Sequence, residues 1–474
     1  MLPRDLPRGD PRGAGGAHAL QAGHRGAGGG ISRRPHLSGG PGRRGTGAAQ
    51  GGPASGALQH RNPPAREGLR QGPHRTPRGG GAKGHGGGIG GEDPRGSQGG
   101  REAFAGGAAR GGDVSTPSRR VYALEQKSRG RKVAAVFPAR YPAELLWARE
   151  VCPVEVWDPP AGGQAAQAHL QANVCSVVQR GLSLWLSGGT EVADFLLFSH
   201  TCDSLQNLST LVPHLLGEKR PCLFFYPPKG RRDDLAERYL VDHLAGLSER
   251  LDEAAGRAGE GALERAVAWG EARGRALNDL YDARAAGGLA ASNEDFYASV
   301  RACEYLWPEE AVQRLEAFRR ERSGPSPPGV PLVFSGVLPQ PAGLLARLDG
   351  LGVRIVEDDF LACGRRFVRG ALPPAGEVLS TVARRLLALP PCSTAGSPVS
   401  DRLDFLARLA GRSSARGVVF LSLKFCEPEL FDVPALAEGL RSRGVPCLVL
   451  EVEMGGEVPA QTLTRIEAFL ETLP

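Results

Sequence analysis

The fold is decided by the stretch from Val192 to Pro228, VADFLLFSHTCDSLQNLSTLVPHLLGEKRPCLFFYPP. It begins with an apolar run of strand length, which leads into a polar turn that holds Cys202. A segment with apolar residues at helical spacing follows, and PCLFFY forms a second apolar run. Short apolar runs are typical of strands buried in parallel sheets. The stretch therefore predicts a strand, a helix and a second strand of an α/β fold.

The same pattern returns from Gly417 to Glu453, where GVVFLSLKFCEP leads through VPALAEGLRSRG into PCLVLEVE. Cysteines occupy matching places in the two stretches. Cys202 and Cys222 are 20 residues apart, and Cys426 and Cys447 are 21 apart. The repetition indicates an internal duplication.

A second pair of stretches supports this reading. Val133 to Asp158 and Pro331 to Asp359 each show a Val-rich run, a proline-containing loop, a helical segment and another apolar run. Together the four stretches predict an α/β protein with two Rossmann-like or flavodoxin-like lobes, each built on a parallel sheet. We expect these lobes over residues 120–229 and 326–474.

Residues 230–325, between the lobes, are rich in Ala, Leu, Glu and Arg, and their apolar residues recur at helical spacing. Such a composition predicts a helical region. The stretch SGPSPPGVP, which begins at Ser323, is typical of a linker into the second lobe.

The first part of the chain, residues 1–119, is an arm of different composition. Residues 1–113 are dominated by Gly, Arg, Pro and Ala and carry 17 Lys and Arg against seven Asp and Glu. Such a segment buries too little apolar surface to offset its chain entropy, so we expect disorder. Arginines in such an arm can bind nucleic acid phosphates, but solvated disorder is the favoured reading. Translation starting near Val114 is a further alternative.

Targeting signals and cysteine use point to one compartment. The sequence shows no signal-peptide pattern and no uninterrupted run of 18 apolar residues. All nine cysteines lie between Cys152 and Cys447. We expect a soluble cytoplasmic protein with no membrane segment, in which the cysteines are metal ligands or buried apolar residues rather than disulfides.

Cys202 and Cys426 each follow an apolar strand and precede a helix. Ligands of open α/β sheets bind at the carboxyl ends of strands, and a thiolate near helix N–H groups is a suitable metal ligand. Cys175 begins a predicted helix in the first lobe, and Cys392 is its counterpart in the second. Spacing alone leaves ordinary buried cysteines as the alternative. That alternative is favoured for four others, namely Cys152, Cys222, Cys303 and Cys447.

Six motifs resemble one known family, in the order in which the family has them. They are PAELLWA from Pro142, NVCSVVQRGL from Asn173, SHTCDS from Ser199, EDDFLACGRR from Glu357, KFCEPELFDVPAL from Lys424, and LEVEMGG followed by QTLTRIEAF. They look like the iron-sulfur subunits of 2-hydroxyacyl-CoA dehydratases and ATP-dependent benzoyl-CoA reductases, a family that includes the D-component of 2-hydroxyglutaryl-CoA dehydratase. The resemblance covers nearly all of residues 130–474.

The resemblance implies a 4Fe-4S cluster held by Cys175, Cys202 and Cys426, with one iron left open for an acyl-CoA thioester. It also implies a heterodimer with a related second subunit and a separate ATP-dependent iron-sulfur activator that supplies the electron. In the dehydratases this electron gives a ketyl radical, from which water is lost. Relatives with a double cubane use an additional cysteine before a PxE motif. The matching stretch here, AVFPARYPAE, has none, so a single cluster is favoured, with Cys392 as the alternative further ligand.

Neighbouring residues are candidates for substrate contacts. His200 beside Cys202 is the candidate catalytic residue, while Asp203 and Ser204 are equally well explained as a helix N-cap. Arg365 and Arg366 are candidates for binding CoA phosphates, with an exposed cluster of ion pairs as the alternative. Lys229, followed by Arg231 and Arg232, is a weaker CoA candidate. The segment departs from the family at Cys363, where Gly is more usual.

Three functions remain open from the sequence. The favoured one is a dehydratase subunit, and a benzoyl-CoA reductase-type subunit is its alternative within the family. A non-catalytic iron-sulfur protein that transfers electrons is the second class. A binding protein without a cluster, closing two lobes around a small ligand, is the third, and the contexts of Cys175, Cys202 and Cys426 argue against it.

Overall fold

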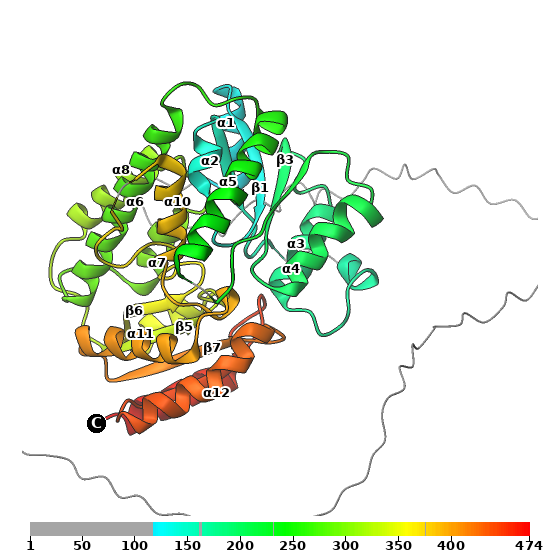
Figure 1. Ribbon diagram of the computed structural model, residues 1–474. Coiled ribbons are helices and arrows are strands. Elements are labelled where there is room, and N and C mark those ends of the chain that lie inside the picture. Colours follow the sequence, from blue (N-terminus) through cyan, green and yellow to red (C-terminus); the bar gives the residue numbers. More distant parts are fainter. Residues whose placement is uncertain (1–116, 161–163, 231, 375) are drawn as a thin grey trace, which may run out of the picture. The chain divides into compact units, whose positions relative to one another are not determined.

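The computed structural model describes residues 117–474 except 161–163, 231 and 375 (Figure 1). The arm predicted over residues 1–119 therefore lies almost entirely outside the described residues, and so does Arg231. Helix α1 (Arg119–Ser128) begins at the last residue assigned to the arm. Its N-cap is Ser118, whose hydroxyl accepts a hydrogen bond from the backbone N–H of Val121 at 3.3 Å.

The strands of the described chain form two parallel sheets of four strands each. The first sheet has the order β2-β1-β3-β4 and the second has the order β6-β5-β7-β8. The strands are β1 (Lys132–Phe137), β2 (Val151–Glu155), β3 (Phe195–Ser199), β4 (Cys222–Phe225), β5 (Val330–Gly336), β6 (Val353–Phe360), β7 (Gly417–Leu423) and β8 (Cys447–Val452). Because the two orders match strand for strand, the predicted duplication of an α/β lobe is confirmed.

Burial explains why these runs form strands. All five residues of β3 and all seven of β7 are buried, and only the first residue of β1 is exposed. Strands covered on both faces read as continuous apolar runs, because helices exclude water from both sides of a parallel sheet.

The helices occupy the positions that the sequence pattern indicates, and residues 230–325 hold α5 to α8. The helices after α1 are α2 (Ala143–Trp147), α3 (Ser176–Leu186), α4 (Asp203–Thr210), α5 (Asp234–Ala255), α6 (Ala262–Ala285), α7 (Asn293–Ala302), α8 (Pro308–Glu321), α9 (Leu344–Gly350), α10 (Val378–Leu387), α11 (Val399–Arg412), α12 (Glu427–Ser442) and α13 (Ala460–Thr472). Three short turns are η2 (Gln164–Ala168), η3 (Leu211–Leu215) and η4 (Ser393–Ala395). None of the helices in the described residues combines the length and apolar character needed to cross a membrane.

A helix from the second half of the chain belongs to the apolar cluster on one face of the first sheet. Leu240 and Leu244 of α5 belong to the same buried cluster as Leu197 of β3, and Val382 and Ala383 of α10 complete it. Figure 1 shows α10 beside α5, and the two helices are in contact. The halves of the chain therefore share a core rather than folding as separate layers.

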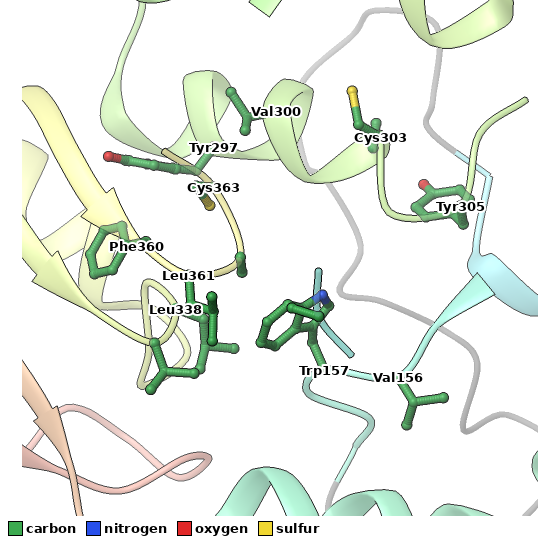
Figure 2. Close-up of a cluster of buried hydrophobic side chains, with 14 of the residues drawn as sticks. Val156, Trp157, Tyr297, Val300, Cys303, Tyr305, Leu338, Phe360, Leu361 and Cys363 are labelled. Carbon is green, nitrogen blue, oxygen red and sulfur yellow. The ribbon is translucent and has the colours of Figure 1, made fainter. Parts of the chain in front are cut away.

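A second apolar cluster joins both lobes to the helical region (Figure 2). Trp157 follows β2, Leu338 and Leu361 follow β5 and β6, and all three are at most 5% exposed. Cys303 and Cys363 are buried in this cluster. Their apolar surroundings indicate a packing role for both thiols.

Candidate functional site

The three candidate ligand cysteines occupy equivalent positions at the N-termini of helices. Cys175 is the N-cap of α3, Cys202 of α4 and Cys426 of α12. None of the three makes a side-chain capping hydrogen bond. The placement of Cys202 and Cys426 between a strand and a helix is as predicted, and so is that of Cys175 at a helix start. Asp203 is the first residue of α4, so the predicted N-cap at Asp203 or Ser204 lies one or two residues late.

The backbone turns sharply before Cys426. Phe425 has a φ of 62°, which non-glycine residues adopt rarely, and its side chain is 40% exposed. The turn is closed by a hydrogen bond from the N–H of Cys426 to the carbonyl of Leu423 at 2.9 Å. Lys424 donates its backbone N–H to the carbonyl of Val452 at 2.9 Å and its ammonium to Glu453 at 2.8 Å. This turn carries Cys426 from the end of β7 onto the start of α12.

Burial raises the pKa of all three thiols, that of Cys175 to about 11 and that of Cys426 well above the usual range. The thiols lie near enough to influence one another: negative charge on Cys202 raises the pKa of Cys175, and both raise the pKa of Cys426. Backbone N–H groups at the helix starts act in the opposite direction. Burial and mutual repulsion therefore favour the protonated thiols, and a bound cation would favour the thiolates.

A single metal ion and a 4Fe-4S cluster make different demands on the three thiols. Within residues 117–474, as far as they are described, no group of three or more His, Cys, Asp and Glu side chains is placed to hold one metal ion. A 4Fe-4S cluster makes a different demand, because each cysteine binds a separate iron of the cube. Three neighbouring thiols, each at a helix start whose N–H groups favour negative charge, fit that demand.

His200 is buried beside these cysteines. It is 3% exposed, and its ring stacks on Tyr226 with the centroids 4.1 Å apart. Neither ring nitrogen has a hydrogen-bond partner among the described residues, although Asp203 Oδ1 lies 3.5 Å from Nε2. Burial and the charge of Lys229 lower the pKa of His200. At neutral pH the imidazole is therefore uncharged and has one N–H to donate.

Arg365 is fully buried in the second lobe. Its guanidinium donates to Asp359 Oδ1 at 2.8 Å, to Glu429 Oε1 at 2.6 Å and to the carbonyl of Gly336 at 3.1 Å. Arg402 donates to the other oxygens of both carboxylates, at 3.2 and 3.1 Å. These ion pairs are interior, unlike the exposed cluster considered from the sequence. Contact of Arg365 with CoA phosphates stays a prediction.

Arg366 of the second lobe forms an ion pair with Glu155 of the first lobe. Its Nη1 donates to Glu155 Oε1 at 2.7 Å, and its Nη2 donates to the other oxygen of the same carboxylate. Both arginines also line a cavity of about 850 Å³, counted with its open mouth, which Arg140, Arg273 and Arg385 share. CoA binding by Arg366 and by the exposed Lys229 likewise stays a prediction. Lys229 Nζ donates to the carbonyl of Thr201 at 3.4 Å.

Cys392 stands apart from the other candidate ligands in its surroundings. Its sulfur is fully buried, 3.1 Å from Arg365 Nη1 and 3.1 Å from Thr394 Oγ1. Burial alone would raise the pKa of this thiol, but the positive charges of Arg365 and Arg140 outweigh burial and lower the pKa. A role of Cys392 as a further cluster ligand stays a prediction.

Two residues with charged side chains at the site, the buried Glu429 and the half-buried Arg140, were not identified from the sequence. Glu429, in the first turn of α12, holds Arg365 and Arg402 together. Arg140, in the loop after β1, has a φ of 57° and lines two cavities. In the sequence, the stretch AVFPARYPAE is notable only for the cysteine that it lacks. Its position at the carboxyl end of a strand was the signal that could have pointed to Arg140.

Known proteins similar to this chain come from one group of enzymes. The chain is 24% identical to the (R)-phenyllactyl-CoA dehydratase beta subunit of Clostridium sporogenes, over 76% of this chain and 97% of that protein. It is 24% identical to the beta subunit of lactoyl-CoA dehydratase from Anaerotignum propionicum, with the same shares covered. A benzoyl-CoA reductase subunit from Thauera aromatica is 26% identical over 67% of this chain and 84% of that protein.

A family model gives the same result independently of these single relatives. The model described as 2-hydroxyglutaryl-CoA dehydratase, D-component, matches residues 138–473. The match includes the first lobe from the end of β1 onward, the helical region, the second lobe and all three cysteines at the helix starts. The chain therefore belongs to the 2-hydroxyglutaryl-CoA dehydratase D-component family.

Proposed function

We propose that this chain is the iron-sulfur subunit of a 2-hydroxyacyl-CoA dehydratase-type enzyme, with a 4Fe-4S cluster bound by Cys175, Cys202 and Cys426. The observation that carries the proposal is the placement of these thiols at three helix starts, close enough for each to influence the pKa of another. The similarity to two dehydratase beta subunits supports the same activity.

A bound cluster supplies one-electron chemistry at the thioester carbonyl of an acyl-CoA, which in this proposal leads to loss of the 2-hydroxyl group as water. The chain's own residues bind and orient. The first-turn N–H groups of α3, α4 and α12 stabilise negative charge on the sulfurs. The catalytic role of His200, which lies two residues before Cys202, stays a prediction.

The proposal includes partners and a compartment. The two dehydratase relatives named above are beta subunits, so we infer a heterodimer with a related second subunit. An ATP-dependent iron-sulfur activator supplies the electron in this proposal. The nine cysteines are all free thiols, which agrees with a reducing cytoplasm.

Reduction of an aromatic acyl-CoA is the second candidate activity. It is favoured by the 26% identity to the benzoyl-CoA reductase subunit. Both activities need the same cluster and differ in the acyl group bound. Turnover assays with 2-hydroxyacyl-CoAs and with benzoyl-CoA, in the presence of activator, ATP and reductant, separate the two.

The cluster is tested directly by iron analysis. We expect full-length protein purified without oxygen to be brown and to contain about four iron and four sulfide per chain. Substituting Cys175→Ala, Cys202→Ala or Cys426→Ala should remove most of this iron. Iron and acid-labile sulfide are measured chemically, and the visible absorption spectrum is recorded beside them.

Cys447→Ala and Cys222→Ala are the matched controls. Both cysteines begin strands, at the opposite end of the sheets from the candidate site, so both variants should retain iron. Colourless protein without iron would contradict the proposal. Equal iron loss in the control variants would contradict the assignment of ligands.

A further inference from the structure

A second cavity opens at the carboxyl end of the first sheet. Its lining comes from the loops after β1, β3 and β4, from α10 and from the turn at Thr394. Its volume is about 490 Å³, counted with its open mouth. In the order β2-β1-β3-β4, β2 lies on one side of β1 and β3 on the other, so the strand order reverses between β1 and β3. Ligands of open α/β sheets bind at such a switch point. We call this cavity the switch-point pocket.

The side chains with ionisable groups that line the switch-point pocket are all basic. They are Arg140, His200 and Arg232, and the described lining contains no Asp or Glu. The acidic influences on these three side chains come from Asp203, 3.5 Å from His200 Nε2, from Asp401, which acts on Arg232, and from the thiol of Cys392, which acts on both arginines. The pocket therefore has an excess of positive charge.

Arg140 is held in place by neutral acceptors. Its Nη1 donates to the carbonyl of Pro390 at 3.0 Å and its Nη2 to the carbonyl of Leu386 at 3.4 Å. Burial lowers the pKa of Arg140 to about 10; the thiol of Cys392 opposes this shift, and the charges of Arg232 and Arg365 add to it. A cation desolvated beside other cations is stabilised when an anion binds next to it.

Arg232 and His200 complete the group. Arg232 donates to the carbonyl of Leu389 at 3.2 Å and to Ser397 Oγ at 3.0 Å, and it has donors beyond these two. His200 is 3% exposed, and both of its ring nitrogens lack a hydrogen-bond partner in the described part of the chain. A buried polar side chain without a partner calls for a bound group to satisfy it.

We propose that the switch-point pocket binds a phosphate group, with Arg140 and Arg232 as its charged donors and His200 as a further donor. Phosphate oxygens accept paired hydrogen bonds from guanidinium groups, and a dianion matches two guanidinium charges. Coenzyme A esters and free nucleotides both carry such groups. The inference goes beyond the iron-sulfur proposal and does not require the cluster.

Isothermal titration calorimetry of the full-length protein tests the inference. The titrants are inorganic diphosphate, ADP and coenzyme A, and the variants are Arg140→Gln and Arg232→Gln. Arg250→Gln is the control, because Arg250 is exposed on α5 and the change removes the same charge outside the pocket. Each pocket variant should weaken diphosphate binding by about tenfold or more, as expected for a lost charge-assisted hydrogen bond.

Two results would support the inference and identify the source of the phosphate. Coenzyme A binding more tightly than ADP and diphosphate, with the same dependence on Arg140 and Arg232, assigns the site to a coenzyme ester. Equal binding of ADP and coenzyme A assigns it to a diphosphate-bearing nucleotide portion in general. Because Arg140 also contacts two carbonyls, circular dichroism verifies the fold of its variant, and the exposed Arg232 gives a test that does not depend on that contact.

Two other results would overturn the inference. One is the absence of diphosphate binding to the wild-type protein. The other is diphosphate binding that Arg140→Gln and Arg232→Gln weaken no more than Arg250→Gln does. Iron content is measured on the same samples, so that failure of the phosphate site and failure of the iron-sulfur proposal remain distinguishable. Protein without iron that binds diphosphate through Arg140 would end the cluster proposal and leave the phosphate site intact.

Discussion

Asp158, just after β2, links three parts of the chain through one carboxylate. Arg301 of α7 donates to both of its oxygens at 2.6 Å, Gln340 of the second lobe donates at 2.7 Å, and Arg119 of α1 lies 3.6 Å away. Burial opposes the charge on Asp158, but the guanidinium of Arg301 outweighs burial and holds the pKa of this carboxyl well below its usual range. A single side chain thus contributes to the position of α7 relative to both lobes.

Replacing Asp158→Asn removes that charge and leaves the buried Arg301 with Glu304 as its remaining carboxylate partner. We expect the free energy of unfolding at pH 7 to fall by about 3 kcal/mol, as for a broken buried ion pair. Chemical denaturation followed by circular dichroism measures the change. Asp279→Asn, on an exposed position of α6, is the control and should change the stability little.

The stability difference between the wild-type protein and Asp158→Asn should depend on pH. The pKa of Asp158 is lower in the folded chain than in the unfolded chain, so its stabilisation is complete above the unfolded pKa of about 3.9 and is lost as the pH falls below it. The stability difference between wild type and Asp158→Asn should therefore be constant near neutral pH and shrink below about pH 4. A difference that stays constant down to about pH 3 would contradict the assigned ion pair.

At the scale of the element, two kinds of helix start are found. Ser292 and Asp233 cap α7 and α5 with side-chain oxygens that accept an N–H of the first turn, at 3.0 Å in both cases. Cys175, Cys202 and Cys426 cap their helices without such a bond. Their first turns give up the stabilisation of a good cap, and the N–H groups stay available to the sulfurs.

The substitution Cys202→Ser should affect the stability of the metal-free protein and its iron content in opposite directions. Cys202 has the extended backbone of an N-cap, with φ of −149° and ψ of 169°, and serine is a favoured N-cap residue. We expect the metal-free variant to unfold with a free energy about 1 kcal/mol higher than metal-free wild type, although the variant no longer retains iron. Denaturation and iron analysis of the same samples measure both effects, and Cys202→Ala should lose iron without any gain in stability.

At the scale of the whole molecule, the two lobes are held together by polar as well as apolar contacts. Arg366 of the second lobe and Glu155 of the first are both largely buried, and Tyr141 and Trp157 also donate to the same carboxylate. Breaking one side of such a pair leaves a buried charge uncompensated. Removing the charges of both Arg366 and Glu155 leaves no uncompensated charge in the interior at this pair.

A double-mutant cycle measures this link between the lobes. Arg366→Gln alone should lower the free energy of unfolding by about 3–5 kcal/mol. Glu155→Gln combined with Arg366→Gln should cost less than the sum of the two single changes, with a coupling of about 1–3 kcal/mol. Additive effects would mean that the pair contributes nothing to holding the lobes together.

The strands and the cysteine positions that occur in both lobes could be predicted from the sequence. The apolar runs of β3 and β7 predicted buried parallel strands, and the matched places of Cys202 and Cys426 predicted two equivalent strand ends. Long-range partners could not be predicted in this way, because hydrophobic periodicity says which face of a helix is buried and not what covers it. The pairing of Arg366 with Glu155, 211 residues apart, is an example.

The place of α10 in the apolar cluster beside the first sheet has a consequence for how the protein is made in the cell. As the chain leaves the ribosome, the strands of the first lobe and α5 emerge before residues 378–387 do. Until then Leu240, Leu244 and their neighbours in the shared cluster lack Val382 and Ala383. An incompletely covered apolar face attracts other chains. We therefore expect the newly made first half to depend on chaperones until the rest of the chain has been translated.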